Sequence, residues 1–134
     1  MKLHHIGVVV FSVKESGELY AEHLGMRALA PPVHDPLQRV IVQFWAQEGC
    51  SISIELIEPV GDDSPVAGFL GKGGGLAHLC YEVEDLEMAL EDARQKGAIV
   101  ISGPVPAAAF QQRRIAFVIL RGIGVTEFVE KSSS

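Results

Sequence analysis

The sequence predicts an α+β fold in which two βαβββ modules pair and their strands form a curled mixed sheet. Three observations lead to this prediction: short apolar runs typical of strands, two segments with helix signals, and landmarks that recur once along the chain. A chain of 134 residues with 48% hydrophobic and 21% charged residues has enough apolar material for one core. We therefore expect a single domain covering residues 1–134.

The expected strands are short, rich in Val, Ile and Phe, and bounded by Gly, Pro or charged residues. Runs of this length and composition are typical of β-strands. They cover residues 3–11, 40–45, 52–57, 76–83, 115–120 and 125–129.

Two segments between these strands carry helix signals. Ser12 and Glu15 form a capping box at the start of the first helix, and Gly25 is a natural left-handed stop at its end. The second helix begins after Asp85, an N-cap residue, and ends at Gly97. Apolar residues at helical spacing predict one buried face on this second helix: Leu86, Ala89, Leu90 and Ala93.

Landmarks of the first half of the chain recur in the second half in the same order, at an offset of 72 or 73 residues. The matched pairs are His5 and His78, Ser12 and Asp85, Gly25 and Gly97, and Glu55 and Glu127. The chain is therefore interpreted as a duplicated module, with halves at approximately 1–70 and 74–131. Because each half buries only one face of its sheet, we expect the two halves to close one core together.

Two of these matched pairs consist of residues that can bind a metal ion. His5 and His78 open the first strand of each half, whereas Glu55 and Glu127 lie late in the last strand. A pseudo-twofold arrangement would bring two imidazoles and two carboxylates together as a metal site. Nitrogen and oxygen ligands without thiolate suit a divalent Zn, Ni, Co or Mn ion, and an octahedral ion would keep two positions for substrate or water.

The alternation of side chains along a strand gives a second argument that Glu55 belongs to the predicted metal site. Side chains alternate along a strand, so Glu55 shares a mostly polar face with Ser51 and Ser53. Either this face lines a cavity or it is the ordinary solvent-facing side of an antiparallel strand. His4 and His5 face opposite sides for the same reason, and the repeat selects His5.

Charge and apolar patterning exclude several classes of function. A net charge of −6 is the opposite of what binding to nucleic acid requires. No apolar run is long enough to span a membrane, and the first residues lack the apolar core of a signal peptide. We therefore expect a cytoplasmic protein without nucleic-acid or membrane partners. Cys50 and Cys80 form no disulfide pattern and are expected to be reduced.

Four segments together resemble a known family: residues 5–10 (HIGVVV), 54–65 (IELIEPVGDDSP), 76–86 (LAHLCYEVEDL) and 127–130 (EFVE). They are similar to the vicinal oxygen chelate superfamily, which includes glyoxalases, bleomycin resistance proteins and dioxygenases. The likeness is strongest to its methylmalonyl-CoA epimerases and glyoxalase I-like proteins and covers residues 3–130. It implies a glyoxalase-like fold around a divalent metal, and a homodimer.

Carried over to this sequence, the resemblance implies metal ligands at His5, Glu55, His78 and Glu127. It implies an enolate-stabilised proton transfer on a methylmalonyl-CoA-type thioester, with one carboxylate removing the α-proton and a second acid returning it. The alternatives are a glyoxalase I-like lactoylglutathione lyase, acting on a thiol adduct, and a non-catalytic small-molecule binding protein of the resistance type.

The sequence departs from the epimerase pattern at residues 33–39, where those enzymes carry a glutamate. The second proton-transfer group therefore has several candidates. Asp35 or His34 takes that role, or a liganding carboxylate, Glu127 or Glu55, moves between metal and proton. A further alternative is that the natural substrate differs from that of the epimerases.

Overall fold

The computed structural model describes residues 1–132, so the last two residues of the predicted domain, 133–134, lie outside the described residues. The chain divides into two compact units. The N-terminal unit is residues 5–77, and the C-terminal unit combines residues 1–4 with the residues from His78 onward. The first strand, β1 (Lys2–Val9), begins in the C-terminal unit and continues into the N-terminal one.

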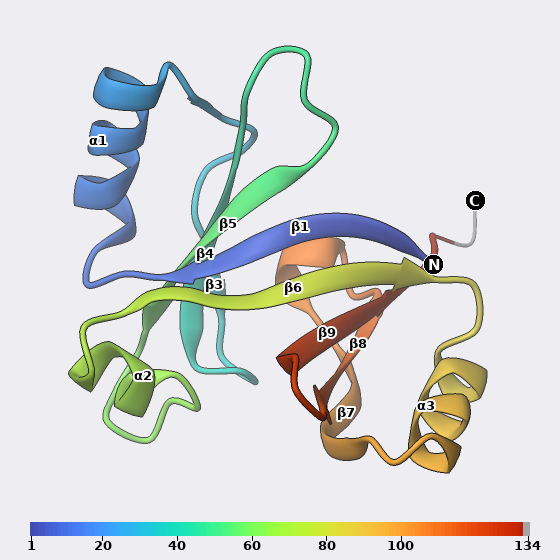
Figure 1. Cartoon of the computed structure of the whole chain (residues 1–134). Helices are drawn as coiled ribbons and strands as arrows, with labels where there is room; N and C mark the ends of the chain where they lie inside the picture. The colour runs from blue at the N-terminus through green and yellow to red at the C-terminus, as the bar shows by residue number, and fades with distance from the viewer. Residues whose placement is uncertain (133–134) are drawn as a thin grey trace. The chain divides into compact units, whose positions relative to one another are not determined.

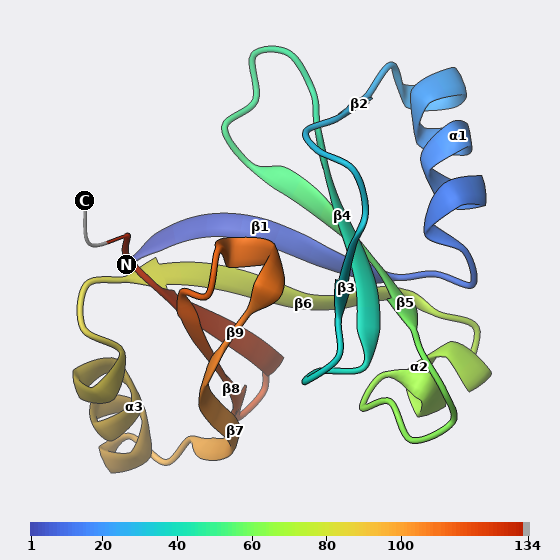
Figure 2. The same cartoon turned by 180° about the vertical axis from the view of Figure 1, so that it is seen from behind.

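The N-terminal unit arranges its strands in the order β2, β4, β5, β1, and β3 also pairs with β4 (Figure 1; β2 is labelled in Figure 2). β1 and β5 run parallel, whereas β4 is antiparallel to β5, β2 and β3. Its elements after β1 are α1 (Val13–Leu24), β2 (Arg27–Ala28), β3 (Val33–Asp35), β4 (Val40–Ala46), β5 (Ser53–Pro59) and the short helix α2 (Ala67–Gly71).

Helix α1 begins and ends where its sequence signals predict. The Ser12 hydroxyl accepts a hydrogen bond from the Glu15 backbone N–H, and Gly25 adopts a left-handed conformation with φ of 65°. The Glu58 carboxylate accepts a further bond from the Val13 N–H at 2.8 Å. These contacts satisfy N–H groups that a helix start leaves unpaired. The helix packs on a core built around Trp45 and Leu56.

The C-terminal unit repeats this plan, with the strand order β6, β9, β8, β7 (Figure 2). β6 and β9 are parallel, and β8 is antiparallel to both β9 and β7. Its elements are β6 (Gly75–Val83), α3 (Leu86–Gln95), β7 (Ile99–Pro106), a 3₁₀ turn (Ala108–Phe110), β8 (Arg114–Leu120) and β9 (Gly124–Glu130).

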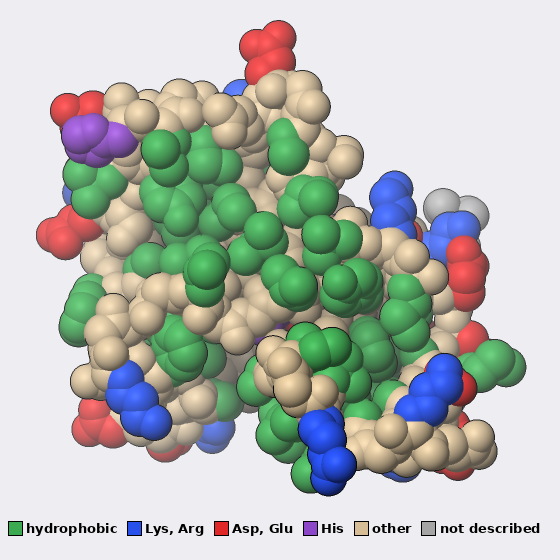
Figure 3. All heavy atoms as spheres, in the orientation of Figure 1, with side chains coloured by type: hydrophobic (Ala, Val, Ile, Leu, Met, Phe, Trp, Pro, Cys, Tyr) green, Lys and Arg blue, Asp and Glu red, His purple; other side chains and the backbone are tan. Residues whose placement is uncertain are grey.

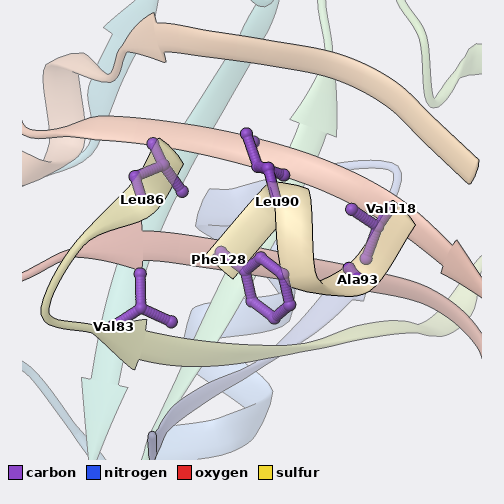
Figure 4. Packing of buried hydrophobic residues seen from close by; sticks show 7 residues of the cluster. Val83, Leu86, Leu90, Ala93, Val118 and Phe128 are labelled. Atoms are coloured by element: carbon purple, nitrogen blue, oxygen red, sulfur yellow. The ribbon is translucent and has the colours of Figure 1, made fainter. Parts of the chain in front are cut away.

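Helix α3 presents the predicted apolar face to its sheet. Leu86, Leu90 and Ala93 are buried against β-strand side chains that include Val118 and Phe128 (Figure 4). Asp85 caps the helix by accepting a hydrogen bond from the Met88 N–H at 2.9 Å. Burial of the four aliphatic and aromatic side chains other than alanine contributes about 1.5–3 kcal/mol each.

The α+β class and both βαβββ modules agree with the sequence prediction, and all six predicted strands are present with shifted ends. The sequence reasoning did not identify β7, because Gly103 and Pro104 interrupt its apolar pattern. Proline lacks a backbone N–H and is tolerated at a sheet edge, which is where β7 lies in its unit. The short elements β2, β3 and α2 were also not predicted.

Large hydrophobic side chains are exposed in both units, and Figure 3 shows many hydrophobic side chains at the surface. Within residues 1–132, no helix combines the length and apolar character needed to cross a bilayer. Cys50 is exposed and Cys80 is buried, and no disulfide joins them.

Candidate functional site

The N-terminal unit brings one predicted histidine and one predicted glutamate together. His5 is fully buried, Glu55 is 6% exposed, and His5 Nε2 lies 3.3 Å from Glu55 Oε1. The contact follows from strand register. His5 pairs with Ser53 across the parallel β1 and β5 strands, so Glu55, two residues further along, projects from the same face.

The C-terminal unit contains the equivalent pair. His78 Nε2 lies 3.1 Å from Glu127 Oε1, and the two side chains are 6% and 3% exposed. Leu79 pairs with Thr126 across the parallel β6 and β9 strands, which puts His78 opposite Val125. Glu127 is again two residues beyond the residue opposite the histidine, so both units build the pair with one register.

Each pair also has a phenylalanine that the sequence reasoning missed. Phe44 is the cross-strand partner of Glu55, and Phe117 is the partner of Glu127. The ring of His5 meets Phe44 edge-on at 5.1 Å between centroids, and that of His78 meets Phe117 at 5.4 Å. The two phenylalanines are 73 residues apart, the same offset as the histidines, and this repeat was the available signal.

The donor atoms of each pair suit a divalent ion. With metal–ligand distances of about 2.1 Å, two ligands of one ion lie about 3.0 Å apart in octahedral geometry and about 3.4 Å apart in tetrahedral geometry. The separations of 3.3 Å and 3.1 Å within the pairs fall in this range. His5, Glu55, His78 and Glu127 are therefore candidate metal ligands.

The burial of Glu55 decides between the two interpretations of its strand face. A side chain that is 6% exposed is not on an ordinary solvent-facing side, so that alternative is wrong. The opposite face of β5 carries Leu56, which belongs to the core under α1. Parity therefore places Glu55 on the face opposite to Leu56, as the sequence predicted, and that face passes from the exposed Ser51 through the half-buried Ser53 to the buried Glu55.

Asp35 has a clear local role. Its Oδ1 accepts hydrogen bonds from the Leu37 and Gln38 backbone N–H groups, both at 3.1 Å, and its Oδ2 accepts one from Gln38 Nε2 at 2.7 Å. These bonds hold the turn between β3 and β4. Asp35 pairs with Val40, whereas Glu55 pairs with Phe44, four residues or about 13 Å along β4.

The remaining histidines are not part of the two His–Glu pairs, although His4 has a ligand atom within 4.8 Å of one on His5. His34 is exposed in β3, and His23 is exposed in the last turn of α1. His4 projects from the face of β1 opposite to His5. Its ring meets Phe110 edge-on at 5.5 Å between centroids. The histidine that the repeat selects, His5, is the one that contacts Glu55.

Known proteins are similar to this chain in both sequence and fold. The sequence profile of the Glyoxalase/Bleomycin resistance protein/Dioxygenase superfamily matches residues 4–117. An ethylmalonyl-CoA/methylmalonyl-CoA epimerase from Cereibacter sphaeroides is 33% identical over 119 residues, which are 87% of this chain and 87% of that protein. A mitochondrial methylmalonyl-CoA epimerase from Bos taurus is 35% identical over 103 residues, 75% of this chain and 57% of that protein.

The crystal structure of a methylmalonyl-CoA epimerase from Mycobacterium tuberculosis shows the same architecture. It covers 98% of this chain and 88% of its own, with a TM-score of 0.86 and 27% sequence identity. The glyoxalase-like fold expected from the sequence is therefore confirmed.

Proposed function

Because the chain belongs to the glyoxalase/bleomycin resistance/dioxygenase superfamily, we propose that it is a metal-dependent epimerase that inverts C2 of a methylmalonyl-CoA-type thioester. The main support is that relatives 33% and 35% identical to it are named as epimerases of this class. The His–Glu pair found in each unit supports the same assignment, since each pair combines metal ligands with a carboxylate suited to proton transfer.

We assign His5, Glu55, His78 and Glu127 as the ligands of one divalent ion. Two imidazole nitrogens and two carboxylate oxygens suit Zn, Ni, Co or Mn, and the spacing within each pair fits ligands of one ion. When bound, such an ion acts as a Lewis acid toward substrate oxygens. Phe44 and Phe117 hold the two imidazole rings in orientation by edge-on packing.

The proton transfer is assigned to carboxylates. Glu127 or Glu55 takes the proton from C2 of the thioester, and the electron pair of the broken C–H bond moves toward the thioester carbonyl. A second acid then returns a proton to the opposite face of C2, which completes the inversion without net change in composition. Both glutamates are nearly buried, at 6% and 3% exposed, and the proton that they carry exchanges with solvent between turnovers.

Asp35 is the further candidate for the second acid. Its carboxylate accepts three hydrogen bonds from the turn that it stabilises, and a protonated Asp35 would lose acceptor strength toward these donors. For this reason we rank the two pair glutamates ahead of Asp35 as proton carriers. The Asp35→Asn variant tests this ranking, since it should retain inversion if the glutamates carry both protons.

Deuterium uptake from heavy water at C2 of methylmalonyl-CoA is the experiment that tests the function. Metal-replete protein is expected to exchange this proton and to invert the centre. Exchange with a methylglyoxal–thiol adduct and with no acyl-CoA would favour the lyase, an alternative that the relatives named above do not support. No exchange with either substrate would favour a non-catalytic binding protein.

The metal assignment has its own readout. We expect about one divalent ion per chain by elemental analysis, and severe loss of it in His78→Ala and Glu127→Gln. His34→Ala is the matched control, because it removes an exposed imidazole that lies outside both pairs. Undiminished occupancy in the two ligand variants would refute the assignment.

We also propose that the enzyme is a cytoplasmic homodimer. The support is the resemblance to its superfamily, whose members usually dimerise. Light scattering coupled to size-exclusion chromatography tests the oligomeric state, and a monomer at working concentration would contradict it.

A further inference from the structure

A row of exposed aliphatic side chains crosses three strands of the C-terminal unit. Ile99 of β7 pairs with Ile119 of β8, and Ile119 pairs with Val125 of β9. These side chains are 61%, 38% and 40% exposed, respectively. Paired residues on neighbouring strands project from the same face, so the three form one continuous strip, here named the aliphatic row.

The aliphatic row ends at the candidate site. His78 lies opposite Val125 in the parallel β6 and β9 pair, so it is the next residue across the sheet. Side chains two residues apart along a strand share a face, so Phe117 lies on the same face as Ile119, and Glu127 on the same face as Val125. Phe117 and Glu127 are cross-strand partners and form the adjacent row. The aliphatic row and the His78–Glu127 pair are therefore neighbours on one face of one sheet.

Exposure changes sharply along this face. On the far side of Glu127 from the aliphatic row, the paired residues Ile115 and Val129 are 1% and 0% exposed. The chain thus covers the aliphatic side chains on one side of the Glu127 row and leaves those on the other side open. A substrate held beside His78 and Glu127 would reach only the open side.

The chemistry of the aliphatic row identifies the part of the substrate that fits it. Ile99, Ile119 and Val125 are hydrocarbon side chains without a hydrogen-bond donor or acceptor. The amides of a CoA arm would lose their water here without replacement, which is unfavourable. An alkyl group loses only apolar contact with water, so its burial is favourable.

We propose that the aliphatic row receives the 2-alkyl substituent of the substrate and determines specificity for its length. This inference rests on the proposed epimerase function. Neighbouring strands are about 4.8 Å apart, so Val125 is one strand away from His78, and Ile119 is about 10 Å away. A methyl substituent reaches only Val125, whereas longer substituents also contact Ile119. The protein therefore prefers 2-alkylmalonyl thioesters with substituents longer than methyl.

The test compares deuterium exchange at C2 of methylmalonyl-, ethylmalonyl- and propylmalonyl-CoA. Each buried methylene should raise kcat/KM about fourfold in the wild-type protein. In Ile119→Thr, which keeps a β-branched side chain but adds a hydroxyl, the ratio of the propyl to the methyl rate should fall toward one. Ile123→Thr is the matched control: Ile123 is 72% exposed between β8 and β9 and is outside the row, so its ratio should match wild type.

Several results would overturn the inference. The first is a propyl-to-methyl rate ratio of one or below in the wild-type protein, and the second is a ratio that is unchanged in Ile119→Thr. The third is an equal rise in KM for all three thioesters in Ile119→Thr, which would assign the row to the CoA arm. A change of oligomeric state in Ile119→Thr would assign the row to contact with a second copy. Failure of the proposed function has a different signature, since metal-replete wild-type protein would then exchange none of the three esters, and the inference would fail with it.

Discussion

Gly17 in the middle of α1 provides a sharp test of the packing in the N-terminal unit. A Cβ atom added at this position would lie 2.4 Å from Cζ2 of Trp45, with Cε2 and Cη2 at 3.1 Å and 3.2 Å. Trp45 is 8% exposed and belongs to the core under the helix. Helix α1 therefore approaches its sheet closely enough that the indole occupies the space of a side chain.

The effect of Gly17→Ala is the difference between two opposing contributions. Replacing glycine by alanine inside a helix stabilises by about 1 kcal/mol. Overpacking of a buried position costs about 1–3 kcal/mol. We expect a net loss of up to about 2 kcal/mol in the free energy of unfolding, measured by urea denaturation followed by circular dichroism. Gly68→Ala in α2 is the control, because nothing lies within 4 Å of its added Cβ and the substitution should not destabilise.

A double-mutant cycle makes this prediction independent of the absolute values. Trp45→Phe removes the Cζ2 and Cη2 atoms, so Gly17→Ala in this background should recover the helix gain and become stabilising. The coupling energy should then be about 1–3 kcal/mol. A coupling below about 0.5 kcal/mol, the usual limit of additivity, would refute the proposed contact.

Three further predictions concern other parts of the chain. Hydrogen bonds from Arg114 lower the pKa values of Glu87 and Glu130. The stabilisation from these bonds is therefore present above the unfolded carboxyl pKa and is lost as pH falls through the folded pKa values. In Arg114→Gln, the free energy of unfolding measured in urea should fall less steeply as the pH is lowered. Gly103→Ala should strongly destabilise the protein, because φ is +88° and the added Cβ would lie 2.4 Å from the Ile115 carbonyl oxygen. In the control Gly122→Ala, φ is +78° but the added Cβ meets open space, so the loss of stability measured by thermal melting should be only about 1 kcal/mol. A chain ending at Gly71 should show no cooperative melting transition if the two modules form one interdependent domain, and a sharp transition would contradict this proposal.

The repeat is the source of the site prediction, because it identified residues through their position in a module and not through local motifs. It selected His5 over His4 and matched Glu55 to Glu127, and the structure brings a histidine and a glutamate together in each unit. The same offset links Phe44 to Phe117, but a phenylalanine in a strand is so common that only its contact with the histidine ring distinguishes it.

Other features depend on tertiary contacts that local patterns do not encode. The β7 strand contains Gly103 and Pro104, which argue against a strand by propensity, and its pairing with β8 overrides them. Asp35 was identified as a candidate acid from its residue type and position. Its turn contacts depend on where Leu37 and Gln38 direct their N–H groups, which the sequence alone does not specify.

Strand register explains why both units build the pair in the same way. In each unit the first and last strands are parallel neighbours, and the glutamate is two residues beyond the residue opposite the histidine. A displacement of two residues keeps both side chains on one face, whereas a displacement of one would separate them. His4, although it is adjacent in sequence, does not share this register with Glu55, because it projects from the other face, where its ring meets Phe110. The sheets thus position these four side chains through backbone pairing, which holds functional groups more rigidly than loops do.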